Sequence, residues 1–333
     1  SFHGVSAFCP TIKKNEPDGT KYVPTYTEVF GATLCKMMTE DEKIIAITAA
    51  MPSGTGLDHI KHVYPKRYYD AGIAEPHAVV FSAGLASKGF KPVVAIYSTF
   101  LQRAFDNIIH DVCLQNLPVV FAIDRAGVVG EDGATHHGVF DLSYLRHIPN
   151  LVVMSPKDEA ELVSMLKFAV DLRRPCAIRY PRGKGVGVSL DTVACDIELG
   201  KSEIIVERQT AKYSIFAIGN MVENARKASE ILSSKNIVVS VNNMRFEKPL
   251  DETLVINEAK KGRIIVTIED NALAGGFGSA VLEVLSNNNL GNTKVLRLGY
   301  PDEFVEHAKI RELHDKYDLT PEKIAERIEK INL

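Results

Sequence analysis

Residues 92–123 read PVVAIYSTFLQRAFDNIIHDVCLQNLPVVFAI, and this stretch decides the fold. Its two ends, residues 92–97 and 119–123, are continuous apolar runs of the kind that predict buried strands. Between them the apolar residues recur at helical spacing over residues 101–115. A strand, a helix and a second strand in this order predict two parallel strands joined by a crossover helix, and hence a parallel sheet covered on both faces.

The same alternation continues in both directions along the chain. Further strands are expected at residues 43–50, 68–73, 151–154 and 176–180, and helices at 26–38, 76–87 and 158–172. After a Gly-, Val- and Asp-rich connection at 183–200, strands are expected at 213–217, 237–241, 264–268 and 294–298, and helices at 222–233, 276–285 and 321–331. We therefore predict an α/β chain of two domains with mostly parallel sheets flanked by helices. The arm spans residues 1–23, and the domains span 24–185 and 186–333.

Composition excludes several classes of protein. The net charge is −3, from 39 basic and 42 acidic residues, and no Lys/Arg run stands out, so neither nucleic acid nor a membrane surface is an expected partner. No apolar run approaches the ~20 residues of a membrane span. The five scattered cysteines form no C-x-x-C pair, which argues against zinc and for a reducing, cytoplasmic location. The chain begins at Ser1 with no signal-peptide pattern, and we expect it to be a piece of a longer protein.

The segment IAEPHA, residues 73–78, is the first candidate for chemistry. Pro76 suits the first position of a helix, and it holds the preceding Glu75 in an extended conformation. A carboxylate is thereby fixed after a strand, where ligands bind in parallel α/β sheets. The competing interpretation is an acid that caps the helix and is favoured by its dipole.

Two arginine-bearing segments follow strands. Tyr97 ends one strand, and Phe100 and Arg103 open the next helix on one face; core packing and a solvated arginine are the alternative. The run RYPRG at 179–183 ends the last strand of the first domain, where an arginine can clamp a phosphate or, alternatively, form an interdomain ion pair.

The loop at residues 124–138, DRAGVVGEDGATHHG, is the richest stretch of the chain. It leaves a buried strand and combines three acids, Arg125, two histidines and four glycines. Such loops are where parallel α/β folds place their sites, and His136 can exchange protons near neutral pH. The alternative is a solvated polar loop. In the second domain, the Gly-rich run at 272–278 predicts a tight turn with close packing.

Four long segments resemble the 1-deoxy-D-xylulose-5-phosphate synthases, a family related to the transketolases. They are YSTFLQRAFDNIIHDV at 97–112, PVVFAIDRAGVVGEDGATHHGVFDLSYLR at 118–146, RYPRG at 179–183 and MRFEKPLD at 244–251. The resemblance implies a transketolase-like pyrimidine-binding domain followed by a transketolase C-terminal domain. It also implies a transferase that condenses pyruvate with glyceraldehyde 3-phosphate, releasing carbon dioxide, in isoprenoid and thiamine biosynthesis.

The resemblance further implies thiamine diphosphate and Mg²⁺ as cofactors. Glu75 corresponds to the acid that hydrogen-bonds the aminopyrimidine ring, with Phe100 stacked on that ring and Ile73 also in contact with the cofactor. Pro76 and His137 both stand where the family usually has Gln. The metal and diphosphate ligands belong to an N-terminal domain whose signature this chain lacks, so that domain is an expected partner and the chain alone is expected to be inactive. Family members are dimers, and a homodimer is expected here.

The remaining site residues follow from the same resemblance. Those implied to hold the phosphorylated aldehyde are Tyr97, Arg125 and Arg182. Those implied to act in catalysis, by contacting pyruvate, the reaction intermediate or the acceptor carbonyl, are Arg103, Asp132 and His136.

Two other functions remain open at this point. The β-subunit of a 2-oxo acid dehydrogenase has a similar length and the same two-domain plan, although the loop at 124–138 matches the synthases. A non-catalytic interaction module is the second alternative, and the complete set of candidates from Glu75 to Arg182 argues against it.

Overall fold

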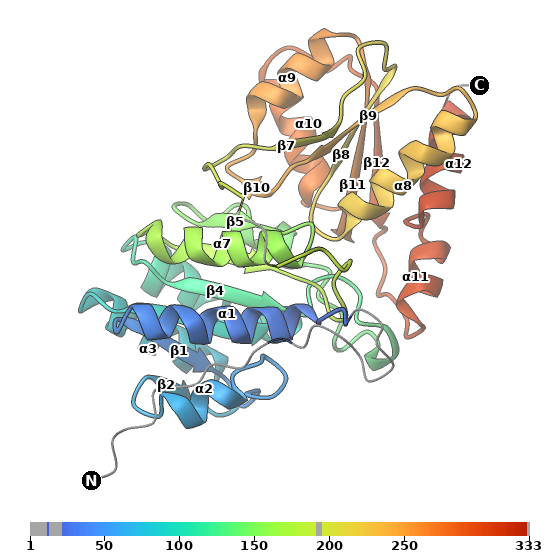
Figure 1. The fold of residues 1–333 in the computed structure, drawn as a ribbon. Helices are drawn as coiled ribbons and strands as arrows, with labels where there is room; N and C mark the ends of the chain where they lie inside the picture. Colours follow the sequence, from blue (N-terminus) through green and yellow to red (C-terminus); the bar gives the residue numbers. More distant parts are fainter. Residues whose placement is uncertain (1–11, 13–21, 191–194, 332–333) are drawn as a thin grey trace. The chain divides into compact units, whose positions relative to one another are not determined.

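The computed structural model describes residue 12, residues 22–190 and residues 195–331 (Figure 1). The chain divides into two compact units. Unit 1 comprises Ser1–Asp124, Ile148–Val152 and Asp158–Ile197, and unit 2 comprises Arg125–His147, Val153–Lys157 and Glu198–Leu333. The units are therefore not two consecutive halves of the chain, because Arg125–His147 is grouped with the C-terminal half.

Unit 1 is built on five parallel strands. In spatial order they are β6 (Cys176–Arg179), β4 (Val120–Asp124), β3 (Lys91–Tyr97), β1 (Ile44–Thr48) and β2 (Tyr68–Asp70). The three strands β1, β4 and β6 are buried along their whole length, as strands covered on both faces must be. The helices of this unit are α1 (Tyr26–Glu40), α2 (Asp58–Val63), α3 (Glu75–Ser87) and α7 (Glu159–Asp171), and Figure 1 shows α1 beside α7.

Local sequence signals explain where two of these helices begin. At the start of α1, the Thr25 hydroxyl accepts a hydrogen bond from the Glu28 N–H at 3.2 Å, and the Glu28 carboxylate accepts one from the Thr25 N–H at 2.8 Å. This reciprocal cap contributes roughly 1 kcal/mol. At the start of α7, the Asp158 carboxylate accepts from the Glu161 N–H at 2.8 Å.

The helix predicted over residues 101–115 is wrong as a single regular element. The chain instead forms α4 (Ser98–Leu101), a 3₁₀ turn (Gln102–Ala104), α5 (Phe105–Asn107) and a π-helical turn (Ile108–Cys113). The apolar spacing is compatible with all three kinds of helix, so the sequence pattern does not distinguish them. Departures of this kind from regular α-helix often occur at functional sites.

Unit 2 contains a second, mostly parallel sheet. Its strands, in spatial order, are β12 (Val295–Tyr300), β11 (Ile264–Ala272), β8 (Tyr213–Ala217), β9 (Val239–Asn243) and β7 (Glu203–Val206). Among the described strands of this sheet, only the edge strand β7 runs antiparallel. The helices that accompany it are α6 (Asp141–Leu145), α8 (Met221–Ser234), α9 (Glu252–Lys260), α10 (Phe277–Asn287), α11 (Ile310–Lys316) and α12 (Pro321–Ile331). An apolar core of strand and helix side chains fills this unit.

Short elements account for most of the differences from the prediction. Unit 2 also holds the pairing of β10 (Phe246–Lys248) with β5 (Val152–Met154), which is antiparallel. The strands β7 and β10 and the helices α2, α9 and α11 were not expected, because they are short and carry few apolar residues in a regular period. The predicted fold class, two mostly parallel sheets flanked by helices, is confirmed.

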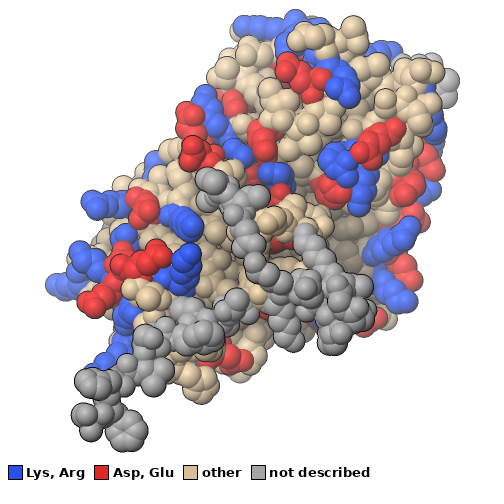
Figure 2. Space-filling view, in the orientation of Figure 1, with Lys and Arg blue, Asp and Glu red and all other residues tan. Residues whose placement is uncertain are grey.

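The surface carries charges of both signs. On the face shown in Figure 2, Lys and Arg are interspersed with Asp and Glu, as the net charge of −3 leads us to expect. Within the described ranges, no helix is both long enough and apolar enough to cross a membrane.

Candidate active site

A buried carboxylate stands at the start of α3. Glu75 is only 3% exposed, and its Oε1 accepts a hydrogen bond from Nη1 of Arg103 at 2.8 Å. Among the residues that the structure describes, this is the only hydrogen bond to the carboxylate, which leaves Oε2 without one. The Glu75 carboxylate faces Arg103 and makes no capping hydrogen bond to a backbone N–H of its helix, although it stands in the first turn of α3, where the helix dipole favours an acid.

The turn before Glu75 is held by the end of β2. The Asp70 carboxylate accepts hydrogen bonds from the N–H groups of Ala50 at 2.7 Å and Gly72 at 3.0 Å. Pro76 lies in the first turn of α3, as its fixed φ favours. The predicted cofactor contact Ile73 is 83% exposed in this turn.

Aromatic and cationic groups stand beside this carboxylate. The rings of Tyr97 and Phe100 are stacked, with centroids 5.4 Å apart and an interplanar angle of 13°. The Arg103 guanidinium carbon lies 5.4 Å from the Phe100 ring centroid, within cation–π range. Tyr97 is buried against Gly54, where an added Cβ would overlap the tyrosine hydroxyl. Four of the predicted site residues, Glu75, Tyr97, Phe100 and Arg103, thus form one cluster in unit 1.

Arg182 is an exposed side chain in unit 1, and a buried acid anchors the backbone that follows it. Glu159, at the start of α7, is completely buried. Its carboxylate accepts hydrogen bonds from the N–H groups of Val186, Gly187 and Val188 at 2.9, 2.7 and 2.9 Å. We call this arrangement the Glu159 clamp. Sequence reasoning missed it, because the only local signal is an acid in a first helical turn.

The remaining predicted residues lie in unit 2, on a loop closed at its base. Gly127 and Gly138 exchange two backbone hydrogen bonds, at 2.7 and 2.8 Å. Within this loop, Arg125 and His136 are half-buried and Asp132 is exposed. His136 Nδ1 lies 2.9 Å from the Thr135 hydroxyl. We refer to residues 125–138 as the 125–138 loop.

His137 has a structural role in this loop. It is 3% exposed, its Nδ1 accepts from the Val129 N–H at 3.0 Å, and its Nε2 lies 3.0 Å from the Glu306 carbonyl oxygen. Because a carbonyl can only accept, Nε2 carries the proton and the imidazole is the neutral tautomer. A glutamine also offers one acceptor and one donor, so both hydrogen bonds are compatible with either side chain.

The Gly-rich run at 272–278 is a tight turn, as predicted. The buried Glu269 accepts hydrogen bonds from the N–H groups of Phe277 at 2.7 Å and Gly278 at 2.8 Å, at the start of α10. A Cβ on Gly276 would overlap this carboxylate. The turn therefore serves to cap a helix.

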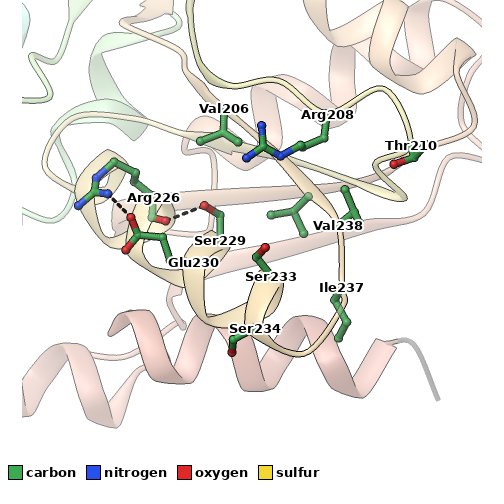
Figure 3. Close-up of a pocket in the computed structure, with 11 residues that line it drawn as sticks. Val206, Arg208, Thr210, Arg226, Ser229, Glu230, Ser233, Ser234, Ile237 and Val238 are labelled. Carbon is green, nitrogen blue, oxygen red and sulfur yellow. Dashed lines mark hydrogen bonds and ion pairs between the residues drawn. The ribbon is translucent and has the colours of Figure 1, made fainter.

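A separate pocket in unit 2, of about 620 Å³, includes none of the predicted site residues (Figure 3). It is lined by the end of β7 and the segment after it, by α8, and by residues 237–239 at the start of β9. Arg226, on its wall, donates hydrogen bonds to the carboxylates of Glu223 at 2.8 Å and Glu230 at 2.5 Å, so two acids already pair with this guanidinium. Elsewhere in the described residues, no group of three or more His, Cys, Asp or Glu is arranged to hold a metal ion.

Two transketolase domains match successive parts of the chain. Residues 23–186 match the pyrimidine-binding domain of transketolase, and residues 200–324 match the transketolase C-terminal domain. The chain is 51% identical over 331 residues to 1-deoxy-D-xylulose-5-phosphate synthase 2 of Geobacter sulfurreducens, covering 99% of this chain and 53% of that protein. It is 53% identical to the synthase of Caldanaerobacter subterraneus, covering 98% and 51%. The chain thus spans about half the length of the curated relatives that it matches.

Solved structures agree in fold. A split-gene transketolase, described as an inactive beta4 tetramer, aligns with a TM-score of 0.80 and 29% identity, covering 93% of this chain and 98% of that one. The transketolase of Campylobacter jejuni aligns with a TM-score of 0.77 over 97% of this chain and 48% of its own, at 18% identity, which supports the fold alone.

Proposed function

The chain belongs to the transketolase family, as a pyrimidine-binding domain followed by a transketolase C-terminal domain, and we propose that it is part of a 1-deoxy-D-xylulose-5-phosphate synthase. In this proposal the complete enzyme condenses pyruvate with glyceraldehyde 3-phosphate and releases carbon dioxide. The support is about 50% identity to curated synthases over almost the whole chain. We propose domains at residues 24–185 and 186–333, supported by the two domain matches.

The observation that carries the proposal is the environment of Glu75. A carboxylate that is 3% exposed keeps one oxygen without a hydrogen bond among the described residues, and the half-buried Phe100 ring belongs to the same cluster. A flat heteroaromatic ring with an N–H donor would satisfy both groups, and the aminopyrimidine of thiamine diphosphate is such a ring. When bound, that cofactor would supply the electron sink that decarboxylation of pyruvate requires.

The residues of this chain would position and polarise the reactants. Glu75 would accept a hydrogen bond from the pyrimidine and exchange a proton with it, while Arg103 holds the carboxylate in place. Tyr97 and Arg125 would bind the phosphorylated aldehyde together with Arg182, whose guanidinium suits bidentate phosphate contacts.

Proton transfer at the pyruvate side is assigned to the 125–138 loop. His136 is half-buried, as a proton donor near a carbonyl must be if it is to reach both substrate and solvent. Asp132 lies four residues before it, and we propose that the two contact pyruvate and the acceptor carbonyl in turn.

We propose that this chain alone is inactive and that Mg²⁺ and the diphosphate are bound by a domain outside it. Magnesium requires oxygen ligands in near-octahedral geometry. The matched synthases are about twice as long as this chain, and the similar split-gene transketolase is described as inactive. Among the described residues, the buried Cys35, Cys113 and Cys176 are in no disulfide bond, and we propose a reducing, cytoplasmic location on this basis.

We also propose a homodimer, with the surface near Glu75 at the interface. Ile73 is 83% and Val80 42% exposed there, and exposed apolar groups of this kind are typical of protein contacts. Light scattering at high concentration should detect a dimer, and Val80→Glu should weaken it. A strictly monomeric parent chain would contradict the assembly.

The direct test of the function combines the chain with a diphosphate-binding domain, supplied in trans. Product formation from pyruvate and glyceraldehyde 3-phosphate should require both components. The chain alone, titrated calorimetrically with thiamine diphosphate and Mg²⁺, should bind more weakly than micromolar. Micromolar binding by the chain alone would contradict the division of the site, and oxidative decarboxylation without condensation would identify a 2-oxo acid dehydrogenase instead.

A further inference from the structure

A further buried acid, Asp270 of β11, lies against the base of the 125–138 loop. It is 1% exposed, and its Oδ1 accepts hydrogen bonds from the Val128 N–H at 3.1 Å and the Tyr300 hydroxyl at 2.7 Å. Its Oδ2 accepts from the Asn220 side-chain amide at 2.8 Å. One carboxylate therefore connects the loop to three other elements of unit 2.

This carboxylate is held in its charged form. Burial alone would raise the pKa of Asp270, but the charge interaction with His314, followed by the hydrogen bonds from Asn220 and Tyr300, lowers it to about 2. His314 Nε2 lies 3.7 Å from Oδ2. Removing a partner from a buried charge strongly destabilises the folded chain. The groups that donate hydrogen bonds to the Asp270 carboxylate are therefore held in fixed positions.

The loop approaches Asp270 too closely for any side chain to intervene. Gly127 has a φ of +79°, a conformation that favours glycine, and an added Cβ would overlap the Asp270 carboxylate. Gly127 is also one half of the backbone bridge to Gly138 that closes the loop. The Asp270 carboxylate thus fixes the base of the 125–138 loop, at the bridge between Gly127 and Gly138.

We propose that Asp270 is a positioning residue that sets the placement of Asp132 and His136 through the base of the 125–138 loop. The inference rests on the proposed function, since those two residues are assigned there to the substrate. The path is short and stiff: a 3₁₀ turn spans Gly130–Asp132, and the His136 N–H bonds the Gly133 carbonyl at 2.9 Å. His137 anchors the outer part of the same loop.

Hydrogen–deuterium exchange tests the anchor without any assay of activity. Asp270→Ala removes the acceptor of the Val128 N–H and should speed exchange across the 125–138 loop by roughly ten- to a hundredfold. Asp270→Asn keeps an oxygen for that N–H but loses the charge, so the increase should be only severalfold. The matched control is Glu269→Ala, which removes the neighbouring buried carboxylate and should affect the start of α10 instead.

Unchanged exchange in the loop of both Asp270 variants would overturn the anchor. If Asp270→Ala does not fold, Asp270→Asn decides alone, and unchanged loop exchange in it overturns the proposal. In the enzyme reconstituted with its diphosphate-binding domain, Asp270→Ala should lower kcat/KM for both substrates by about the same factor, while the affinity for thiamine diphosphate stays at the parental value.

The kinetic outcomes separate this inference from the proposed function. If the loop of Asp270→Ala exchanges faster while its kcat/KM stays parental, the positioning role is refuted. The proposed function would stand, because the parent enzyme would still be a synthase. A parent enzyme without synthase activity would refute the proposed function, and with it the assignment of Asp132 and His136 on which the positioning role depends. Equal loss of cofactor affinity and kcat/KM would mark Asp270 as merely structural.

Discussion

Replacing Glu159 should loosen the segment after Arg182 and destabilise unit 1. In the parent chain the buried carboxylate accepts three backbone N–H bonds, two at Oε1 and one at Oε2. In Glu159→Gln, the amide oxygen can keep the two from Gly187 and Val188, but the amide NH₂ then faces the Val186 N–H. The variant loses one charged hydrogen bond and turns two into neutral ones.

The magnitude follows from these contacts. A hydrogen bond to a charged group contributes about 1.5–3 kcal/mol and a neutral one about 1 kcal/mol, so Glu159→Gln should cost about 3 kcal/mol. For a unit of this size that corresponds to a loss of about 6–12 °C in Tm. Glu159→Ala removes three charged hydrogen bonds and leaves three buried N–H groups without an acceptor, so it should cost more, at least about 4.5 kcal/mol.

Differential scanning calorimetry and hydrogen exchange at residues 185–188 measure the two effects. The matched control is Glu252→Gln, because Glu252 also begins a helix but is exposed, and its change should stay within about 0.5 kcal/mol. A Glu159→Gln chain with the parental Tm and parental exchange at 185–188 would refute the reasoning about the clamp.

Three further outcomes follow from the site. In the complete enzyme, Arg182→Ala should raise KM for glyceraldehyde 3-phosphate roughly ten- to a hundredfold and leave KM for pyruvate nearly unchanged; equal changes in steady-state kinetics would make Arg182 structural. The depressed pKa of Asp270 should contribute about 2 kcal/mol of stability that is present above pH 4 and lost as pH falls toward 2; denaturant unfolding should show this loss in the parent and not in Asp270→Asn. His137→Gln should unfold within about 1 kcal/mol of the parent, whereas His137→Ala should lose about 2 kcal/mol, and equal losses by calorimetry would contradict the bridging role.

The architecture could be predicted from the sequence because its central strands are buried on both faces. Short uninterrupted apolar runs that alternate with helical segments predict strands covered on both faces, and residues 93–97 and 119–123 are such runs. The antiparallel β7 and the short β10 gave no such signal, because an edge strand with exposed and charged residues lacks the pattern. The breaks between Ser98 and Cys113 depend on hydrogen-bond register, which apolar spacing does not encode.

The candidate site was predictable where its residues follow strand ends or lie close together in sequence. Phe100 and Arg103, three apart, do lie together, and Arg103 also reaches Glu75. The anchors of the two loops could not be found in this way, because Asp270 and Val128 are 142 positions apart and the Glu159 contacts span 27–29 positions. The roles of Arg103, Asp132 and His136 toward substrate stay predictions.

The central claim is that Glu75 is the carboxylate that works on the cofactor ring. It is tested most directly by 1-deoxy-D-xylulose 5-phosphate formation in the reconstituted enzyme carrying Glu75→Gln. The amide can hydrogen-bond but cannot exchange the proton, so we expect a loss of about 10²–10⁴-fold in kcat with a parental Tm. A Glu75→Gln enzyme that forms product at the parental rate would contradict the account.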